Sequence, residues 1–304
     1  MPENVFTTTT NAQFIPTNIA NKCLQRLSSY FSVAKNVSKD SDWTTASSGL
    51  TLSIPKTGAV VANDKTQGSN FTKQNPTATA TSVTLDKHKE VTFTIDDITK
   101  VAENQNTQDR YAEDGAIAIA EALETSILGL QASINNTITW NRTSAATIDS
   151  SLLLIRKFFT DQKVPVLEPK FFTCDPSIYN DLLGQQKYTD ASWRGQNNSV
   201  DEGRMLKVYG FQISESQLIQ RNGSPGTLSN VAFTRNGLIL ASRPLPRPEG
   251  FGGSYSIVND PDIGVSVRTL FWYNGDLGAH QLTIEILYGV AVHDQRRVLE
   301  VEST

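Results

Sequence analysis

The chain has 304 residues, of which 38% are hydrophobic and 19% are charged, and its formal net charge is −4. This length can bury a substantial core in about two domains, and the composition is too apolar for a wholly disordered chain. The acidic balance excludes duplex DNA binding as the main role of the surface, while leaving room for local basic patches.

The sequence gives no sign of secretion or of a membrane span. No basic segment followed by an apolar one opens the chain, so we expect no signal peptide. The longest apolar runs, such as ILYGVAV at 286–292, are far too short to cross a bilayer. Cys23 and Cys174 lie in unrelated contexts and are predicted to be reduced thiols.

The N-terminal part is predicted to be an arm, residues 1–44, that includes one short helix. Residues 1–16 are polar and rich in threonine, and Pro16 precedes a helical pattern from Thr17 to about Val33.

Residues 45–96 predict an extended hairpin with its flanking strands. GLTLSIP at 49–55 alternates apolar and polar residues, as does VTLDKHKEVTFTIDD from residue 83, so both are read as strands. The 19 residues between 66 and 84 have Phe71 as almost their only large apolar side chain and cannot bury enough surface to fold alone. We therefore expect a hairpin whose tip projects from the body and is received by another subunit.

Four residues of this hairpin are candidate subunit contacts: Lys56, Lys65, Phe71 and Lys73. The lysines are interpreted either as solubilising charges or as contacts to acidic patches on a neighbour.

The segment AEDGAIAIAEALETSILGLQASI at 112–134 predicts one long helix. Its apolar residues recur at steps of three and four, and they are Ala116, Ile119, Leu123, Ile127, Leu130 and Ile134. The opposite face carries Glu113, Glu121, Glu124, Thr125 and Gln131. With the polar lead-in from Glu103, the helix would reach about thirty residues, or roughly 45 Å. That is two to three times the usual length in globular proteins.

The remaining residues predict an α/β body followed by a terminal hairpin. A second amphipathic helix has the stripe Ile148, Leu152, Ile155 and Phe159, and KFFTC at 170–174 follows as a buried strand. Asp175 and Pro176 have the positions of an N-cap and a first helical residue. Strands are expected within 205–216, 230–242, 263–271 and 282–292, with NGDLG at 274–278 as the turn between the last two.

The sequence predicts no catalytic residue, no cofactor and no metal. His88, His280 and His293 each stand alone, without a second ligand at metal-binding spacing, and no nucleophile elbow or phosphate-binding loop is present. Asp260 and Asp262 could face a hard cation or serve a hydrolase, but Asp-Pro-Asp is more often turn chemistry. Arg243 and Arg247 lie among prolines, where they either bind a phosphate or a neighbour's acid, or belong to a solvated loop.

Four stretches read together resemble the major capsid proteins of tailed bacteriophages, whose fold is shared with herpesvirus capsids. They are LEPKFFTCDPSIYNDLLG at 167–184, EGRMLKVYGFQISESQLI at 202–219, NVAFTRNGLILASRPLP at 230–246, and the ending from Val265 to Val301. The resemblance covers nearly the whole chain.

The resemblance implies an α+β fold with four parts. A peripheral domain, residues 97–144 and 276–304, would pair a long spine helix with a long β-sheet, and residues 145–275 would form an axial α/β domain. The extended hairpin arm and the N-terminal arm complete it. The axial domain has no room for the β-barrel that some relatives insert, and the short N-terminal arm cannot be a cleaved scaffolding segment.

The implied function is that of a major capsid protein and not of an enzyme. It would assemble with itself into pentamers and hexamers of an icosahedral shell around double-stranded DNA, which it would touch non-specifically. A scaffolding protein and a portal are implied partners, with a decoration protein as a further one. The chain would assemble in the host cytoplasm and reside in the virion. An encapsulin-like compartment shell and another virion component such as a tail protein are the alternatives.

Overall fold

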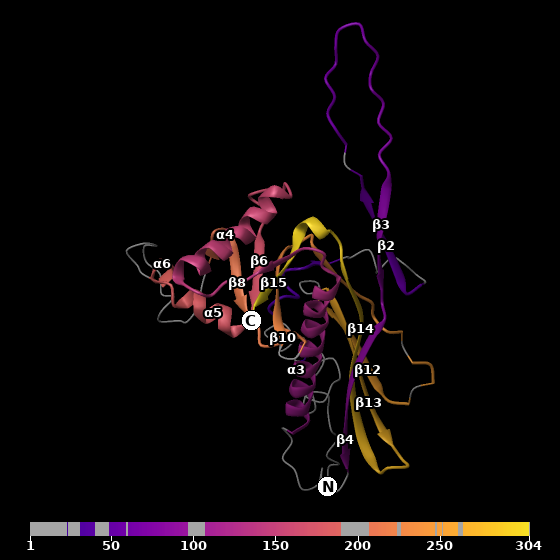
Figure 1. The fold of residues 1–304 in the computed structure, drawn as a ribbon. Coiled ribbons are helices and arrows are strands. Elements are labelled where there is room, and N and C mark those ends of the chain that lie inside the picture. The colour runs from indigo at the N-terminus through magenta and orange to yellow at the C-terminus, as the bar shows by residue number, and fades with distance from the viewer. Residues whose placement is uncertain are drawn as a thin grey trace, which may run out of the picture.

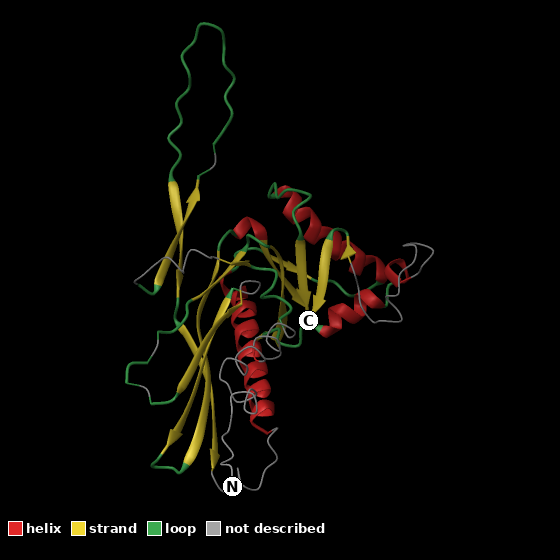
Figure 2. Cartoon of the chain, turned by 180° about the vertical axis from the view of Figure 1, so that it is seen from behind, coloured by secondary structure: helices red, strands yellow, loops and turns green. Residues whose placement is uncertain are grey.

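The computed structural model describes Cys23 and residues 31–39, 49–58, 60–96, 107–189, 207–223, 226–246, 248–250, 252–260 and 264–303. Figure 1 shows two bodies side by side, each containing a β-sheet, and a long hairpin that projects beyond them. Figure 2 shows from behind that helices and strands are mixed in both bodies, so the predicted α+β class is confirmed. The helix predicted between Thr17 and Val33 lies mostly outside the described residues.

The first sheet has six strands in the order β1, β11, β14, β13, β12, with β4 also paired to β14. Their bounds are Ser38–Lys39 (β1), Lys87–Asp96 (β4), Leu238–Ser242 (β11), Ser254–Asp260 (β12), Val265–Asn274 (β13) and Ala279–Val292 (β14). β13 and β14 form the predicted terminal hairpin, in which Asn274 pairs with Ala279. β14 is the longest of the described strands, and β4 pairs antiparallel to it from Lys87 to Asp96.

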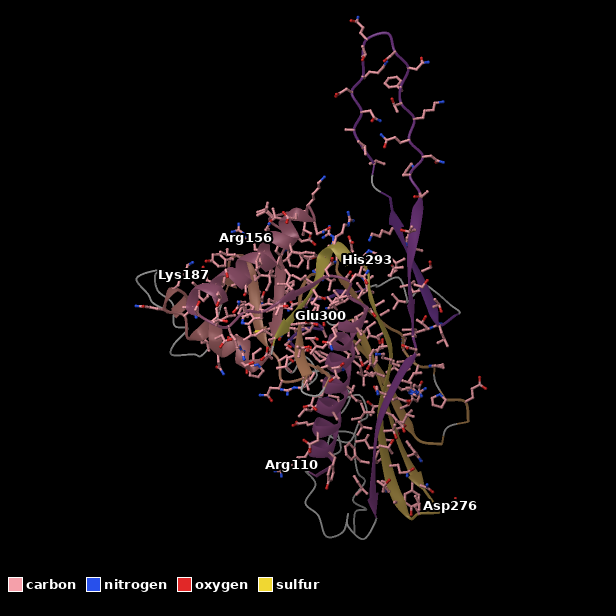
Figure 3. All side chains as sticks on the ribbon, viewed as in Figure 1. Arg110, Arg156, Lys187, Asp276, His293 and Glu300 are labelled. Atoms are coloured by element: carbon pink, nitrogen blue, oxygen red, sulfur yellow. The ribbon has the colours of Figure 1, made fainter. Side chains whose placement is uncertain are left out.

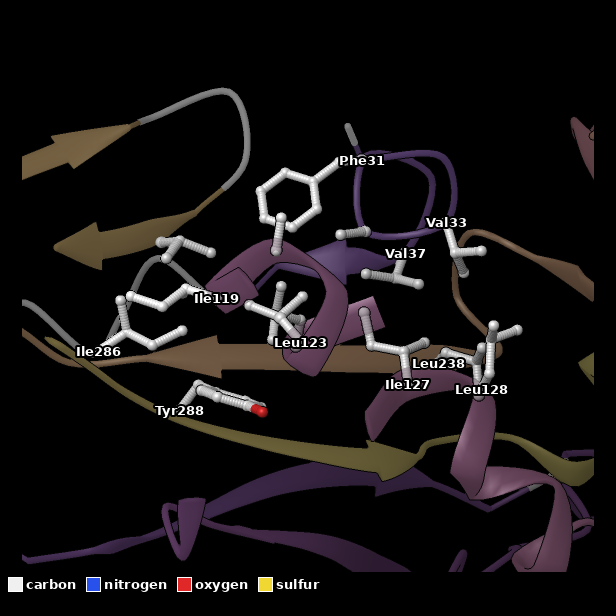
Figure 4. Close-up of a cluster of buried hydrophobic side chains, with 14 of the residues drawn as sticks. Phe31, Val33, Val37, Ile119, Leu123, Ile127, Leu128, Leu238, Ile286 and Tyr288 are labelled. Carbon is white, nitrogen blue, oxygen red and sulfur yellow. The ribbon is translucent and has the colours of Figure 1, made fainter. Parts of the chain in front are cut away.

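In the described part of the chain, the long helix α3 covers one face of this sheet. α3 spans Thr107–Leu128, and a 3-10 turn, η3, continues it over Gly129–Ser133. Five of the six residues of the predicted apolar stripe are buried, namely Ala116, Ile119, Leu123, Ile127 and Ile134, and the sixth, Leu130, is partly buried against the same core. They join one core cluster with the side chains that β14 directs toward the helix, namely Leu282, Ile284, Ile286 and Tyr288 (Figure 4).

Two residues placed on the exposed face of this helix by the sequence pattern are buried, which corrects the prediction. Glu124 is 2% exposed, and its carboxylate accepts hydrogen bonds from the backbone of residues 32–34 at 2.8 to 3.1 Å and from the Ser32 hydroxyl at 3.0 Å. Gln131 is also 2% exposed. Glu124 is covered by a segment about 90 residues away in sequence, which a helical period cannot reveal.

The second sheet has seven strands in the order β5, β15, β10, β6, β8, β7, with β9 also paired to β10. Their bounds are Thr137–Thr139 (β5), Lys170–Cys174 (β6), Lys207–Val208 (β7), Phe211–Glu215 (β8), Arg221–Gly223 (β9), Gly226–Thr234 (β10) and Val298–Ser303 (β15). Three helices accompany it: α4 (Ala145–Asp161), α5 (Pro176–Leu183) and α6 (Gln186–Thr189).

The local signals read in this part of the sequence are confirmed. The stripe of α4, Ile148, Leu152, Ile155 and Phe159, is buried in the core of the second sheet. Asp175 caps α5 by accepting a hydrogen bond from the amide of Ser177 at 3.0 Å, and Pro176 is its first residue. A start signal that was not predicted is the reciprocal capping box between Ser144 and Thr147, which satisfies two backbone amides at the start of α4.

The sheets do not follow the sequence intervals given above for the peripheral and axial domains. β11, β12 and β13, from the interval 145–275, pair in the first sheet with β14, whereas β15, from 276–304, pairs in the second sheet. The two sheets are joined covalently where β14 passes through the 3-10 turn η4 (Gln295–Arg297) into β15. The domain boundaries themselves stay a prediction.

Candidate subunit-contact surfaces

The predicted hairpin exists and projects from the body, and we call residues 51–84 the arm. β2 (Thr51–Thr57) and β3 (Ala78–Thr84) pair antiparallel over their whole length. Beyond this ladder the described residues 60–77 contain no strand and extend far from the two sheets (Figure 1). The legs approach closely at Gly58, where a Cβ atom would lie 2.6 Å from the carbonyl oxygen of Thr77.

The part of the arm beyond the ladder is braced at two places. The side-chain amide of Gln74 bonds both backbone groups of Val61, accepting from its N–H at 2.9 Å and donating to its carbonyl. Near the tip, the Lys65 ammonium donates to Ser69 and lies 5.0 Å from the centre of the Phe71 ring. Such a cation–π contact at an exposed site contributes about 0.5–1 kcal/mol. These contacts hold the outer part of the arm in one conformation, although it has no hydrophobic core.

Large apolar side chains on the arm are left in solvent. Val60 and Val61 are 69% and 68% exposed, and Phe71 is 81% exposed. Isolated exposed apolar residues are ordinary on a protein surface, but here they lie on a segment with no core behind it. The arm therefore offers an apolar surface that the rest of the chain does not cover.

The structure places the sequence-predicted contact residues in three different settings. Lys65, Phe71 and Lys73 lie on the exposed outer part of the arm. Lys56 lies in the β2–β3 ladder, which we call the foot of the arm, and its ammonium forms an ion pair with Asp294 at 3.1 Å. Arg243 donates to the carbonyl oxygen of Gly49 at 2.9 Å. Arg247 lies outside the described residues. That any of these residues contacts a second subunit stays a prediction.

The foot of the arm rests on a charged corner, residues 293–297, that sequence reasoning missed. Figure 3 shows His293 of this corner near the foot of the arm. The Asp294 carboxylate accepts hydrogen bonds from Arg296 at 3.0 Å and lies 3.1 Å from the Lys56 ammonium. Arg297 lies 3.5 Å from Asp294 and also pairs with Glu168, in the loop after α4. A chain of ion pairs therefore connects the arm, the link between the sheets and the α4 side of the second sheet.

The electrostatics of this corner are set by its surplus of cations. Burial alone would raise the pKa of Asp294, but the hydrogen bonds from Arg296 and Lys56 hold it well below the usual range. The pKa of His293 is lowered, by burial and by the charge of Lys56. An open cavity of about 430 Å³ lies between the corner, the arm foot and β1. No sequence signal marks the corner, since the arm and Asp294 come together only in the folded chain.

A second exposed apolar pair lies in the loop that carries Glu168. Val166 and Leu167 are 76% and 98% exposed, and no large hydrophobic side chain in the described parts of the chain exceeds Leu167. The sequence signal is two consecutive apolar residues between Pro165 and Pro169, directly after an amphipathic helix. We call residues 165–168 the knob.

The polar clusters elsewhere have a structural explanation. Asp149 of α4 accepts hydrogen bonds from Tyr209 at 2.8 Å and from Tyr188, and it pairs with Lys187 at 3.0 Å, so it links α4, α6 and the turn before β8. Among the described residues no group of three or more His, Cys, Asp or Glu side chains could hold a metal ion. Cys23 and Cys174 are buried free thiols. No described helix is long and apolar enough to cross a bilayer.

Solved structures from bacteriophages and from a virus-like particle align with the chain. The chain aligns with one from Mycobacterium phage Che8 at a TM-score of 0.66 and 18% identity, covering 89% of this chain and 91% of that one. It aligns with one from the mature capsid of bacteriophage PhiM1 at 0.62 and 16%, covering 90% and 88%. A chain from a virus-like particle of Pyrococcus furiosus aligns at 0.54 and 9%, covering 94% and 98%.

The chain therefore has the fold of the capsid proteins of tailed bacteriophages, as the resemblance predicted. No protein-family model and no curated protein sequence matches the chain. The likeness of fold extends over 89 to 94% of this chain in the three alignments.

Proposed function

We propose that the chain is the major capsid protein of a tailed bacteriophage, which assembles into pentamers and hexamers of an icosahedral shell around double-stranded DNA. One observation carries the proposal: the arm, on a subunit with a capsid fold, has an apolar surface without a core of its own. A subunit that acted alone would gain nothing from such an extension. A subunit in a shell lays it on a neighbour and buries it there.

The remaining partners and the location follow from this proposal. A scaffolding protein would guide assembly, a portal would occupy one vertex, and a decoration protein is an optional partner on the outside. The protein would assemble in the host cytoplasm and remain in the virion. Its role would be structural and not enzymatic, and its DNA contacts would be non-specific.

Replacing residues 60–75 by Gly-Ser-Gly tests the function of the arm. The change leaves the β2–β3 ladder and both sheets intact, so the subunit should fold with an unchanged circular dichroism spectrum. The shortened chain should form no shells under conditions in which the unaltered chain does, as seen by sedimentation and negative-stain electron microscopy. Closed shells from the shortened chain would refute the role of the arm in assembly.

A compartment shell that encloses protein is the second candidate, supported by the likeness to the virus-like particle of Pyrococcus furiosus. Both candidates predict closed shells, so assembly alone does not separate them. Particles isolated from the native source separate them by content. Double-stranded DNA inside supports the phage capsid, and a single abundant protein cargo supports the compartment.

A further inference from the structure

The knob is held rigidly, although it displays two apolar side chains to solvent. The side chain of Lys170, at the start of β6, is buried beneath it. Its ammonium donates to the carbonyl oxygens of Pro165 at 3.1 Å, Val166 at 3.2 Å and Glu168 at 3.3 Å. Burial lowers the pKa of Lys170, because the charged form loses water. The buried ammonium of Lys170 thus fixes the backbone conformation of the knob.

The two ends of the knob are fixed as well. Lys163 has a left-handed backbone conformation with φ 58°, which turns the chain sharply at the end of α4. The amide of the next residue, Val164, donates to the carbonyl oxygen of Phe159 at 3.0 Å. Glu168 is tied to Arg297 by an ion pair. A loop free to relax would fold Leu167 back onto the surface and hide its apolar area. The contacts of this loop prevent Leu167 from folding back. A preorganised contact site requires side chains that are held in place in this way before binding.

We propose that the knob is the receiving site for the arm of a neighbouring copy, with Val166 and Leu167 packed against Val60 and Val61. This inference rests on the proposed function and names the surface that it leaves open. The other large exposed hydrophobics in the described ranges are scattered singly or lie on helix α4, and the arm has the other consecutive pair in a loop. Two apolar pairs that lack cover in their own subunit can cover each other.

The ion pairs at the corner support this choice of partner. The chain Lys56–Asp294–Arg297–Glu168 runs from the foot of the arm to the knob, so arm and knob are fixed relative to each other within one subunit. A ring of identical subunits needs a heterologous contact, in which one surface of each copy binds a different surface of the next. Because the arm and the knob are held at a fixed geometry, their contact determines the rotation from one subunit to the next, and thereby whether the ring closes.

Disulfide trapping tests the contact directly. Val61→Cys and Leu167→Cys chains are purified separately and mixed under assembly conditions with an oxidant, and the native thiols at Cys23 and Cys174 are buried and do not compete. The mixture should give a covalent dimer on a non-reducing gel, whereas each variant alone gives at most a trace. Leu277→Cys, at an exposed apolar site in the β13–β14 turn, is the matched control for Leu167→Cys and should give no dimer with Val61→Cys.

An assembly measurement separates this inference from the proposed function. Leu167→Asp changes an exposed side chain, so it should fold normally, but it should raise the protein concentration needed for assembly about tenfold or more, as expected for a central contact residue. Leu277→Asp should assemble like the unaltered chain. If shells form but neither the cross-link nor the Leu167→Asp defect is seen, the knob is not the receiving site and the proposed function stands. If the unaltered chain forms no shells even with its scaffold, the proposed function fails, and the knob inference fails with it.

Discussion

Glu124 is the sharpest test of how residues 32–34 are held on α3. Its carboxylate is 2% exposed, and one oxygen accepts from the amides of Ser32, Val33 and Ala34 at 2.8, 2.8 and 3.1 Å. The second oxygen accepts from the Ser32 hydroxyl at 3.0 Å. Glu124→Ala removes all four acceptor contacts and leaves three amides without their partner.

The expected loss follows from those contacts. An unsatisfied buried hydrogen-bonding group costs about 1–3 kcal/mol, so three amides give a loss of about 3–9 kcal/mol in the free energy of unfolding. The lower end is expected, because a cavity of about 400 Å³ lined by Ser32, Glu121 and Glu124 lets water reach some of these groups. Many domains are stable by only about 5–15 kcal/mol, so the loss is a large fraction.

Glu124→Gln is the matched control. Its amide oxygen can keep the three amide hydrogen bonds, and its NH₂ group can donate to the Ser32 hydroxyl. Only the charge assistance is lost, so the cost should be about 1 kcal/mol. Both variants are measured as unassembled subunits by urea unfolding followed by tryptophan fluorescence. Equal losses for Ala and Gln, or a loss below 1 kcal/mol for Ala, would refute the explanation.

The pH dependence of the Gln variant provides a second measurement. Burial raises the pKa of Glu124, although the hydrogen bonds from Ala34, Val33 and Ser32 oppose the change. An acid with a raised folded pKa binds more protons in the folded than in the unfolded state, so its contribution falls as pH rises above 4.5. The stability of the unaltered chain relative to Glu124→Gln should therefore decrease as the pH is raised from 4.5 to neutrality. A constant difference over that range would contradict the assigned direction.

Three further predictions concern the core and the charged corner. Leu123→Asp places an unpaired charge at a position with 0% exposure and should cost about 4 kcal/mol or more, seen as loss of soluble subunit, while Glu121→Asp on the exposed face should be nearly silent. Asp294→Asn should lower the free energy of unfolding by about 2 kcal/mol at pH 7. Because the folded pKa of Asp294 lies below its unfolded value of 3.8, the difference in stability between the unaltered chain and the variant should shrink as the pH falls below 4. A difference that grows in acid would refute the role of the carboxylate. Gly289→Ala should cost about 3 kcal/mol in urea unfolding, because its Cβ would lie 2.2 Å from the carbonyl oxygen of Thr84, and a neutral effect would mean that the arm does not sit this close to β14.

Local signals in the sequence predicted most of the elements. The stripe of α4, the cap at Asp175 and the NGDLG turn depend on neighbours within a few residues, so the sequence alone specifies them. The arm was also predictable, because a long segment with Phe71 as almost its only large apolar residue cannot build a core.

Features that depend on tertiary contacts were not predictable in the same way. Glu124 was placed on the solvent face because helical periodicity registers only its own helix, whereas the turn at 32–34 buries it. Lys56 reads as a surface charge until Asp294 is brought beside it by the β14–β15 link. The knob was passed over because two apolar residues between prolines are too short a pattern to signal a surface; the buried Lys170 is what gives them significance.

The passage of β14 through η4 into β15 has a mechanical consequence. One uninterrupted stretch of backbone, residues 279–303, contributes a strand to each sheet, so a pull that separates the sheets is carried by covalent bonds and not by their contact surface. Along β14 that pull would act parallel to the strand, against the antiparallel partners β4 and β13 together. The hydrogen bonds of these ladders would then share the load in shear instead of opening one at a time. A subunit built this way resists stretching along its length.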